Sequence, residues 1–233
     1  MGTLNNSKAV FITGGGSGLG AATAQLMAEQ GWRIGLAGRR SDVLQAAVRT
    51  LKMGAQTYPL DVTDAAAVEQ AIRDFRPTAL VCCAAILGQG SVYDDLSPAR
   101  FAEVHTINVT GTFNACSAAM RLWSENKLFG DIVNISSLGG IRGMQKFPGF
   151  AAYASSKHAI VGLTEALAIE GRPHGIRVNA VAPGTLRTPM IEALGISPKT
   201  TPDSIAGTIA FLLDRTQSQP ITGTTIEVHC NDD

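Results

Sequence analysis

Short apolar runs alternate with amphipathic stretches of helical length along most of the chain. This alternation is typical of β-α-β units, in which successive strands lie parallel in one sheet and the connecting helices cover its faces. The first run is followed by a cluster of glycines and then by a stretch with helical periodicity. We predict strands at Ala9–Thr13, Arg33–Ala37, Gln56–Leu60, Thr78–Cys83, Asp131–Ile135, Arg177–Ala182 and Thr225–Val228.

Capping residues mark the ends of several predicted helices. Gly31 is well placed to end the first helix, and Ser41 or Asp42 to begin the second. Nothing repeats at a fixed period and no linker stands out, so we expect a single domain over residues 1–233. The predicted fold is α/β, with about seven mostly parallel strands and helices on both faces of the sheet. The helices are expected at about Ala21–Gln30, Ser41–Lys52, Asp64–Phe75, Pro98–Trp123, Tyr153–Glu170 and Asp203–Leu213.

The balance of charge and the lack of long apolar runs argue against a nucleic-acid-binding protein and against a membrane protein. The 19 Lys and Arg residues are matched by 19 Asp and Glu residues, which argues against nucleic acid or an anionic membrane as the main partner. No apolar run reaches the roughly 18 residues that a membrane span needs. The N-terminal residues lack the layout of a signal peptide, so we expect a cytoplasmic protein.

The cysteines do not indicate a metal site. They form no C-x-x-C pair and have no histidine partners at metal-ligand spacing. In a cytoplasmic protein they are best interpreted as buried, reduced thiols. The four residues are Cys82, Cys83, Cys116 and Cys230.

A glycine-rich turn follows the first predicted strand, in the segment Thr13–Gly20. Glycines at a turn from strand to helix let the backbone approach a phosphate closely, and the N-terminus of the helix presents free N–H groups to that charge. A merely flexible turn is the alternative, but the strand before it and the helix after it are the context that the motif requires. We therefore predict a dinucleotide site.

The end of the second strand indicates which dinucleotide binds. An acidic residue there would bind the ribose hydroxyls of NAD, whereas this chain has Arg39 and Arg40. A guanidinium matches a phosphate in geometry and keeps its charge at any physiological pH. We expect NADP to be favoured. NAD stays open, because either arginine could simply be a solvated residue of the loop.

Tyr153 and Lys157 are four positions apart in a predicted helix, so their side chains share one face. A tyrosine hydroxyl has an ordinary pKa of about 10, and a nearby ammonium group favours the phenolate and lowers that pKa. The pair is therefore expected to act as a proton donor and acceptor. By itself the spacing is also found by chance on exposed helices.

The glycine turn and the Tyr153-Lys157 pair together make the chain resemble the short-chain dehydrogenase/reductase family, in its single-domain branch. The resemblance covers nearly the whole chain and implies a Rossmann-type, doubly wound sheet. It also implies an NAD(P)-dependent oxidoreductase that interconverts a carbonyl and a secondary alcohol. The other matching motifs are Asp61-Val62, Asn108, Asn134-Ile135-Ser136-Ser137 and Pro183–Thr188.

The family resemblance implies four catalytic residues. Tyr153 would be the general acid or base, and Lys157 would lower its pKa and hold the nicotinamide ribose. Ser137 would hydrogen-bond the substrate oxygen, with Ser136 as the alternative. Asn108 would help to organise a water between Lys157 and solvent. The cofactor-binding residues implied are Gly14, Ser17, Gly18, Leu19, Gly20, Arg39, Arg40, Asp61, Val62, Ala84, Tyr153, Lys157, Pro183, Gly184, Leu186 and Thr188.

The chain departs from the family pattern at three places, and these departures are expected to affect which substrate binds more than they affect the fold. Cys82-Cys83-Ala84-Ala85 stands where the family usually has Asn-Asn-Ala-Gly, and alanine tolerates fewer backbone conformations than glycine. The loop Leu138–Phe150 is lengthened, and it carries Met144, Phe147 and Phe150. A short lid over about residues 188–202 replaces a longer helical one. We expect these loops to shape the substrate pocket.

Two other functions are weighed against this one. A dinucleotide-binding regulator or scaffold with little catalysis would account for the missing Asn-Asn-Ala-Gly and the short lid. An epimerase or dehydratase of the related extended group would need a longer substrate region than this chain has. The resemblance further implies a homodimer or homotetramer formed through the two long helices. The substrate is expected to be a small carbonyl or alcohol whose identity the motifs do not specify.

Overall fold

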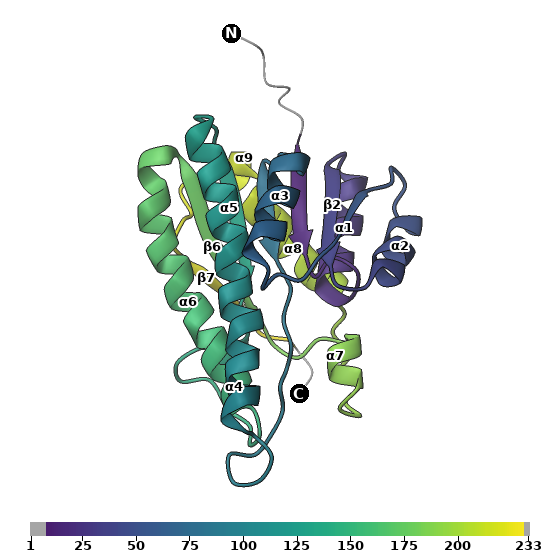
Figure 1. Cartoon of the computed structure of the whole chain (residues 1–233), viewed down its shortest axis with the longest axis vertical. Coiled ribbons are helices and arrows are strands. Elements are labelled where there is room, and N and C mark those ends of the chain that lie inside the picture. Colours follow the sequence, from purple (N-terminus) through teal and green to yellow (C-terminus); the bar gives the residue numbers. More distant parts are fainter. Residues whose placement is uncertain (1–7, 231–233) are drawn as a thin grey trace.

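The computed structural model describes residues 8–230, and its centre is a sheet of seven parallel strands (Figure 1). The strand order is β3-β2-β1-β4-β5-β6-β7, so the connections reverse direction between β1 and β4. This order confirms the predicted doubly wound fold. The strands are β1 (Ala9–Thr13), β2 (Arg33–Gly38), β3 (Gln56–Pro59), β4 (Ala79–Cys82), β5 (Gly130–Ile135), β6 (Ile176–Pro183) and β7 (Thr225–Val228).

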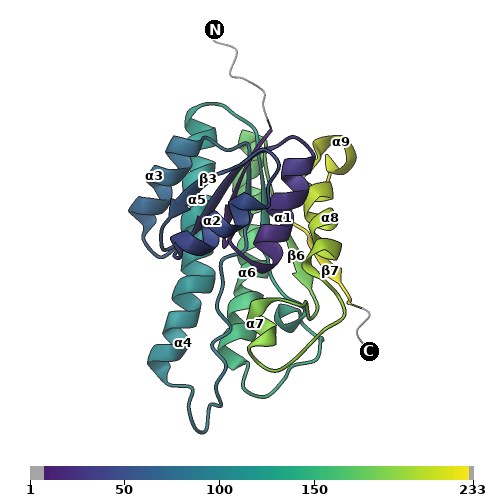
Figure 2. The ribbon, with the colours of Figure 1, turned by 90° about the vertical axis from the view of Figure 1, so that its right-hand side faces the viewer.

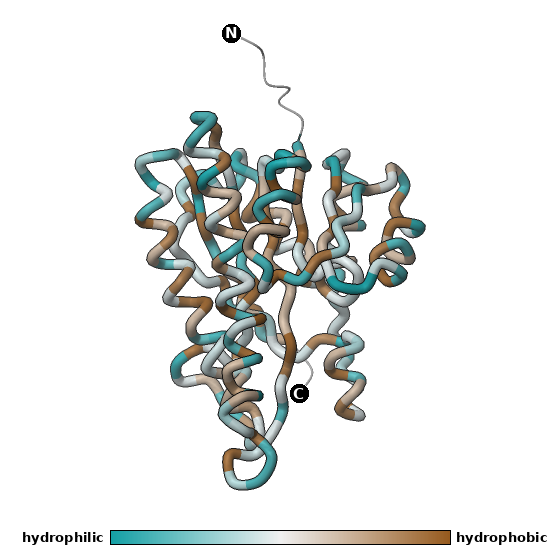
Figure 3. Tube along the Cα trace, viewed as in Figure 1, coloured by the Kyte–Doolittle hydropathy of each residue, from teal (hydrophilic) through white to brown (hydrophobic). Residues whose placement is uncertain are grey.

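Helices cover both faces of the sheet, and each face has its own apolar core (Figure 2). The central strands β1, β4, β5 and β6 are buried on both sides, which explains why they are rich in apolar residues, whereas the edge strands β3 and β7 are partly exposed. Figure 3 shows brown, apolar positions along the sheet, whereas teal positions gather at the turns. One face carries α1 (Gly18–Glu29), α2 (Ser41–Arg49) and α8 (Pro202–Leu213); the other carries α3 (Ala65–Phe75), α5 (Gly111–Glu125) and α6 (Ala151–Gly171).

The predicted helix over Pro98–Trp123 is interrupted by a π-helical turn. It consists of α4 (Pro98–His105), the π turn Thr106–Thr110 and α5. The turn buries Asn108, whose side chain is bonded to neighbouring segments. Wide turns of this kind occur frequently at functional sites, and helical periodicity in the sequence does not reveal them.

Other boundaries differ from the prediction by a few residues, as is usual at helix ends. The first helix begins at Gly18, because Ser17 has an extended backbone and occupies the N-cap position. After β6 the segment contains only one short helix, α7 (Pro189–Glu192), before α8 begins. Within the described residues, no helix is long and apolar enough to cross a membrane.

Candidate active site

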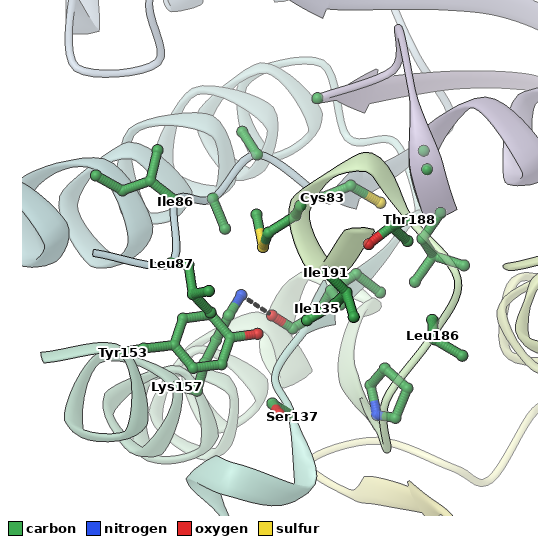
Figure 4. Close-up of a pocket in the computed structure, with 18 of the residues that line it drawn as sticks. Cys83, Ile86, Leu87, Ile135, Ser137, Tyr153, Lys157, Leu186, Thr188 and Ile191 are labelled. Carbon is green, nitrogen blue, oxygen red and sulfur yellow. Dashed lines mark hydrogen bonds between the residues drawn. The ribbon is translucent and has the colours of Figure 1, made fainter. Parts of the chain in front are cut away.

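A cavity of about 920 Å³ lies at the carboxyl ends of the strands, around the point where the strand order reverses. Open α/β sheets bind their ligands at this position. Every cofactor-binding residue predicted from the sequence lines the cavity. Of the four predicted catalytic residues, Ser137, Tyr153 and Lys157 line it, and Asn108 lies behind its wall. Figure 4 shows the part of the cavity that holds these side chains.

The glycine turn is packed so closely that side chains are excluded at two positions. Gly14 has a φ of +66°, and a Cβ added there would lie 2.8 Å from the backbone nitrogen of Ala84. A Cβ at Gly20 would lie 2.4 Å from the carbonyl oxygen of Gly14. The first turn of α1 carries no acidic residue, and the side chain of Ser17 does not cap it. These free N–H groups and the bare backbone fit the phosphates of a dinucleotide.

Arg39 and Arg40 follow β2 and line the same end of the cavity. Both are exposed, and neither side chain forms a hydrogen bond or an ion pair within residues 8–230. Asp61 lies nearby and accepts hydrogen bonds from the backbone and hydroxyl of Thr63, at 2.9 and 2.8 Å. The backbone bond is the largest cause that lowers the pKa of Asp61, and the charge of Arg39 adds a smaller effect. Two guanidinium groups are therefore available to a ligand here.

Lys157 is buried beneath Tyr153 on α6. Its Nζ donates a hydrogen bond of 2.8 Å to the carbonyl oxygen of Ile135 at the end of β5, drawn as a dashed line in Figure 4. Nζ lies 5.6 Å from the centre of the Tyr153 ring. Burial lowers the pKa of Lys157 to about 8, because an ammonium group loses its hydration there. The lysine is thus close to its point of deprotonation at neutral to mildly alkaline pH.

The pKa of Tyr153 shifts upward, which corrects the expectation that Lys157 would lower it. Burial is the largest cause and raises the pKa, while the polar contact with the Ser137 side chain acts in the opposite direction. Lys157 is not among the groups that shift the pKa of Tyr153, and its ammonium group is bonded to the Ile135 carbonyl. Tyr153 therefore stays protonated through the neutral range, which suits a proton donor better than a proton acceptor.

The two serines after β5 have different surroundings. Ser136 is buried, and its hydroxyl donates a hydrogen bond of 2.8 Å to the backbone oxygen of Lys157. The hydroxyl oxygen of Ser137 accepts a bond of 3.2 Å from the backbone of Gly139, so its own hydrogen is not used by that contact. Ser137 also affects the pKa of Tyr153, which places the two hydroxyl groups close together. Ser136 holds β5 against α6, whereas Ser137 is available to a ligand.

Asn108 joins three segments behind the cavity wall. Its Oδ1 accepts a hydrogen bond from the backbone of Ile86 at 2.8 Å, and its Nδ2 donates to the Ile86 carbonyl at 2.9 Å. The same Nδ2 donates to the hydroxyl of Ser156, which in turn donates to the carbonyl of Tyr153. Both amide hydrogens are therefore used within the protein. The direct effect of Asn108 here is to position the segment after β4 against α6.

The Cys82-Cys83-Ala84-Ala85 segment fits the fold without strain. Cys82 is buried with its Sγ 4.0 Å from the Sγ of Cys116, and no disulfide is formed in the described part of the chain. Burial raises the pKa of Cys83 to about 12, so this thiol in the cavity wall is unreactive. Ala85 has no positive φ, so it needs no glycine. Cys82 and Cys116 are buried, as predicted, whereas Cys83 and Cys230 are half-buried. No metal-binding cluster occurs among residues 8–230.

Replacing Lys157 by Met should change the pH dependence of stability in a defined direction. The pKa of Lys157 is lowered from 10.5 in the unfolded chain to about 8. Between these values the unfolded state binds more protons, so the free energy of unfolding rises with pH. The parent's free energy minus that of Lys157→Met should rise by about 1.4 kcal/mol per pH unit across this window.

Urea titrations of both proteins from pH 7 to pH 10.5 measure this difference. Other titrating groups are shared by the two proteins and largely cancel. A difference that is flat with pH would show that Lys157 keeps its ordinary pKa in the folded protein.

Sequence reasoning missed several apolar residues of the cavity. Ile86 and Leu87 follow β4 and lie beside Tyr153 in Figure 4, while Ile191 extends from α7 on the opposite side. The sequence did contain a signal for Ile86 and Leu87: they are apolar residues in a loop just after a parallel strand, where polar residues are more usual. The backbone oxygen of Ile135 was also missed, because a backbone acceptor leaves no mark in the sequence.

Comparisons with known proteins agree with this geometry. A family profile described as short chain dehydrogenase matches residues 8–197. Levodione reductase of Leifsonia aquatica is 37% identical over 200 residues, which cover 82% of this chain and 73% of that protein.

Two solved structures with bound cofactors are also similar to this chain. A short chain dehydrogenase from Mycobacterium paratuberculosis bound to NAD is 30% identical, with a TM-score of 0.85, and the match covers 95% of this chain and 96% of that one. ElxO with NADP bound is 28% identical, with a TM-score of 0.84, and the match covers 96% of this chain and 97% of that one. Similar chains of this fold therefore bind either nicotinamide dinucleotide.

The profile spans most of the described residues, and the glycine turn and the Tyr153-Lys157 pair line one cavity. The chain therefore belongs to the short-chain dehydrogenase/reductase family and is an NAD(P)-dependent oxidoreductase that acts on CH–OH or C=O groups.

Proposed function

We propose that this protein is an NADP(H)-dependent oxidoreductase that uses Tyr153 to give a proton to a carbonyl oxygen, or to take it from an alcohol. The observation that carries the proposal is the placement of the Tyr153 hydroxyl, the Ser137 hydroxyl and the Lys157 ammonium at one end of the cavity that the glycine turn opens into. Following the oxidation of NADPH at 340 nm with a panel of ketones, aldehydes and quinones tests it.

The proton chemistry follows from the surroundings of these groups. The bound cofactor supplies a hydride to the carbonyl carbon, or accepts one from the alcohol. Ser137 donates its free hydrogen to the substrate oxygen and stabilises the charge that develops there. Tyr153 stays protonated at neutral pH and gives its proton to the same oxygen. Lys157 provides a positive charge nearby, with a pKa that allows it to return a proton to the tyrosine.

The other predicted cofactor contacts are assigned by their places along the cavity. Asp61 and Val62 lie after β3, at the end that would receive the adenine. Pro183 ends β6 and Gly184, Leu186 and Thr188 follow it, at the end of the cavity where they would orient the nicotinamide ring.

Replacing Arg39 and Arg40 together by Ala should weaken NADPH binding about tenfold to a hundredfold, because a hydrogen bond to a charged group is worth about 1.5–3 kcal/mol. NADH binding should change by less than about threefold. The parent should bind NADPH more tightly than NADH. Fluorescence titration of the bound cofactor measures all four affinities.

The exposed Arg49, which ends α2 and does not line the cavity, provides a matched control. Arg49→Ala should leave both affinities unchanged. Tighter binding of NADH by the parent would overturn the NADP assignment and leave the oxidoreductase assignment intact.

A regulator or scaffold is the alternative from another functional class. Its support is the unreactive Cys82-Cys83-Ala84-Ala85 segment in place of the family's usual amides. Tight NADPH binding without turnover over the whole substrate panel would favour it. Turnover that depends on Tyr153 would exclude it.

We further infer a cytoplasmic, single-domain protein over residues 1–233 that forms a homodimer or homotetramer. Exposed aromatic side chains on the long helices support the assembly, since Phe101 on α4 is 39% exposed and Phe113 on α5 is 46% exposed. Sedimentation at micromolar concentration tests it, and a monomer alone would contradict it.

A further inference from the structure

The part of the cavity around Tyr153 and Ser137 has mostly apolar walls. They come from three segments that are far apart in the sequence: the stretch after β4, the loop 138–150, and α7 with the residues behind it. Figure 4 shows Leu87 beside Tyr153, and Ile191 on the opposite wall. The apolar residues of these three segments include Ile86, Leu87, Met144, Phe147, Ile191 and Leu194.

The lysines, arginines and aspartate that line the cavity are either remote from Tyr153 or already hydrogen-bonded within the protein, as the Lys157 ammonium is to the Ile135 carbonyl. Arg39, Arg40 and Asp61 lie at the other end, after β2 and β3. In the loop 138–150, Lys146 is the charged side chain that lines the cavity, and its Nζ donates hydrogen bonds to the carbonyl oxygens of Ile141 and Met144, at 2.6 and 2.9 Å. Among the described residues, no carboxylate lines the end near Tyr153. This end offers nothing to neutralise a cationic ligand and few groups to bind several hydroxyls.

Two apolar side chains that line the cavity remain exposed to solvent. Phe147 on the loop 138–150 is 60% exposed, and Ile196 behind α7 is 46% exposed. Both also line the cavity. Exposed apolar side chains at the rim of a pocket indicate a ligand that covers them, because burial of that surface is favourable. An apolar ligand reaching from Tyr153 to the mouth would cover both.

We propose that the substrate is a neutral, predominantly apolar ketone, or the matching secondary alcohol. Its oxygen accepts hydrogen bonds from the Tyr153 and Ser137 hydroxyls, and its hydrocarbon part lies between the segment after β4 and α7. This inference rests on the proposed function. In the reduction, the carbonyl carbon gains the hydride of NADPH and the oxygen gains the proton of Tyr153. A secondary alcohol and NADP⁺ result.

A series of 4-alkylcyclohexanones, from methyl to propyl, tests the proposal. Each added CH2 group that the walls bury should raise kcat/KM about threefold to fourfold. 4-Methylcyclohexanone should exceed 4-hydroxycyclohexanone by about tenfold to a hundredfold, because the pocket leaves the added hydroxyl without a partner. A ketone that carries a carboxylate or an ammonium group should be reduced more slowly than its neutral counterpart.

Two variants locate the effect in the apolar wall. Phe147→Ser should reduce the gain per CH2 group, while Arg142→Ser, an exposed change in the same loop outside the cavity, should keep it. If the hydroxylated or charged ketones were reduced as fast as their neutral apolar counterparts, or faster, the assignment of an apolar substrate would be wrong. The assignment as an oxidoreductase would still hold. If NADPH binds and no ketone of either kind is reduced, the proposed function itself fails.

Discussion

Tyr153→Phe should lower kcat for ketone reduction by about 10²–10⁴-fold, the usual contribution of a positioned proton donor. The phenyl ring keeps the packing against Lys157 and Leu87, so only the proton is lost. Affinity for NADPH should stay within about threefold of the parent. Stopped-flow measurement of NADPH oxidation at saturating substrate, with cofactor titration alongside, gives both values.

Tyr58→Phe is a matched control for this substitution. The Tyr58 hydroxyl donates a hydrogen bond of 2.7 Å to Asp74 and lies outside the cavity. Its removal should leave kcat within about twofold of the parent. If Tyr153→Phe kept the parental rate and Tyr58→Phe did too, another group would have to supply the proton.

Because burial raises the pKa of Tyr153, the expected pH dependence of the rate differs between carbonyl reduction and alcohol oxidation. In reduction the protonated tyrosine is the active form, so activity should persist through neutral pH and fall only at alkaline pH. In oxidation the tyrosine must first lose its proton, so the rate should rise with pH. A pH profile in each direction with the same substrate pair checks these opposite slopes.

Gly20→Ala should weaken NADPH binding by more than about 100-fold and also lower the melting temperature. The new Cβ would lie 2.4 Å from the carbonyl oxygen of Gly14, and a backbone atom cannot move aside as a flexible side chain can. The turn and the N-terminus of α1 would have to separate, which removes the close approach that a phosphate needs. Differential scanning calorimetry and cofactor titration measure the two effects.

Gly207→Ala is the matched control, since Gly207 is also a helical glycine. A Cβ there meets nothing within 4 Å. Alanine should stabilise α8 by about 0.5–1 kcal/mol, because glycine loses more backbone freedom on folding. The two substitutions should therefore change the melting temperature in opposite directions. Parental cofactor affinity in Gly20→Ala would contradict the close packing of the turn.

Much of the fold could be predicted from the sequence because its signals are local. The strands β1 and β7 were predicted with the same bounds that the structure has. Each is recognised from a few consecutive residues, as a run of apolar or β-branched residues between turn residues. The glycine turn and the Tyr153-Lys157 spacing are local for the same reason. The π turn around Asn108 was not predicted. The side chain that it buries forms hydrogen bonds to Ile86 and Ser156, which are distant in the sequence.

The sequence by itself determined the strands, the dinucleotide turn, the arginines after β2 and the side chains that lie on one face of α6. Each depends on the chemistry of a few consecutive residues. The tertiary structure alone decided that burial raises the pKa of Tyr153, that Ser136 is tied to the backbone of α6, and that apolar segments enclose the substrate end. Desolvation and pocket walls depend on residues brought together from several strands and loops. No local pattern in the chain carries that information.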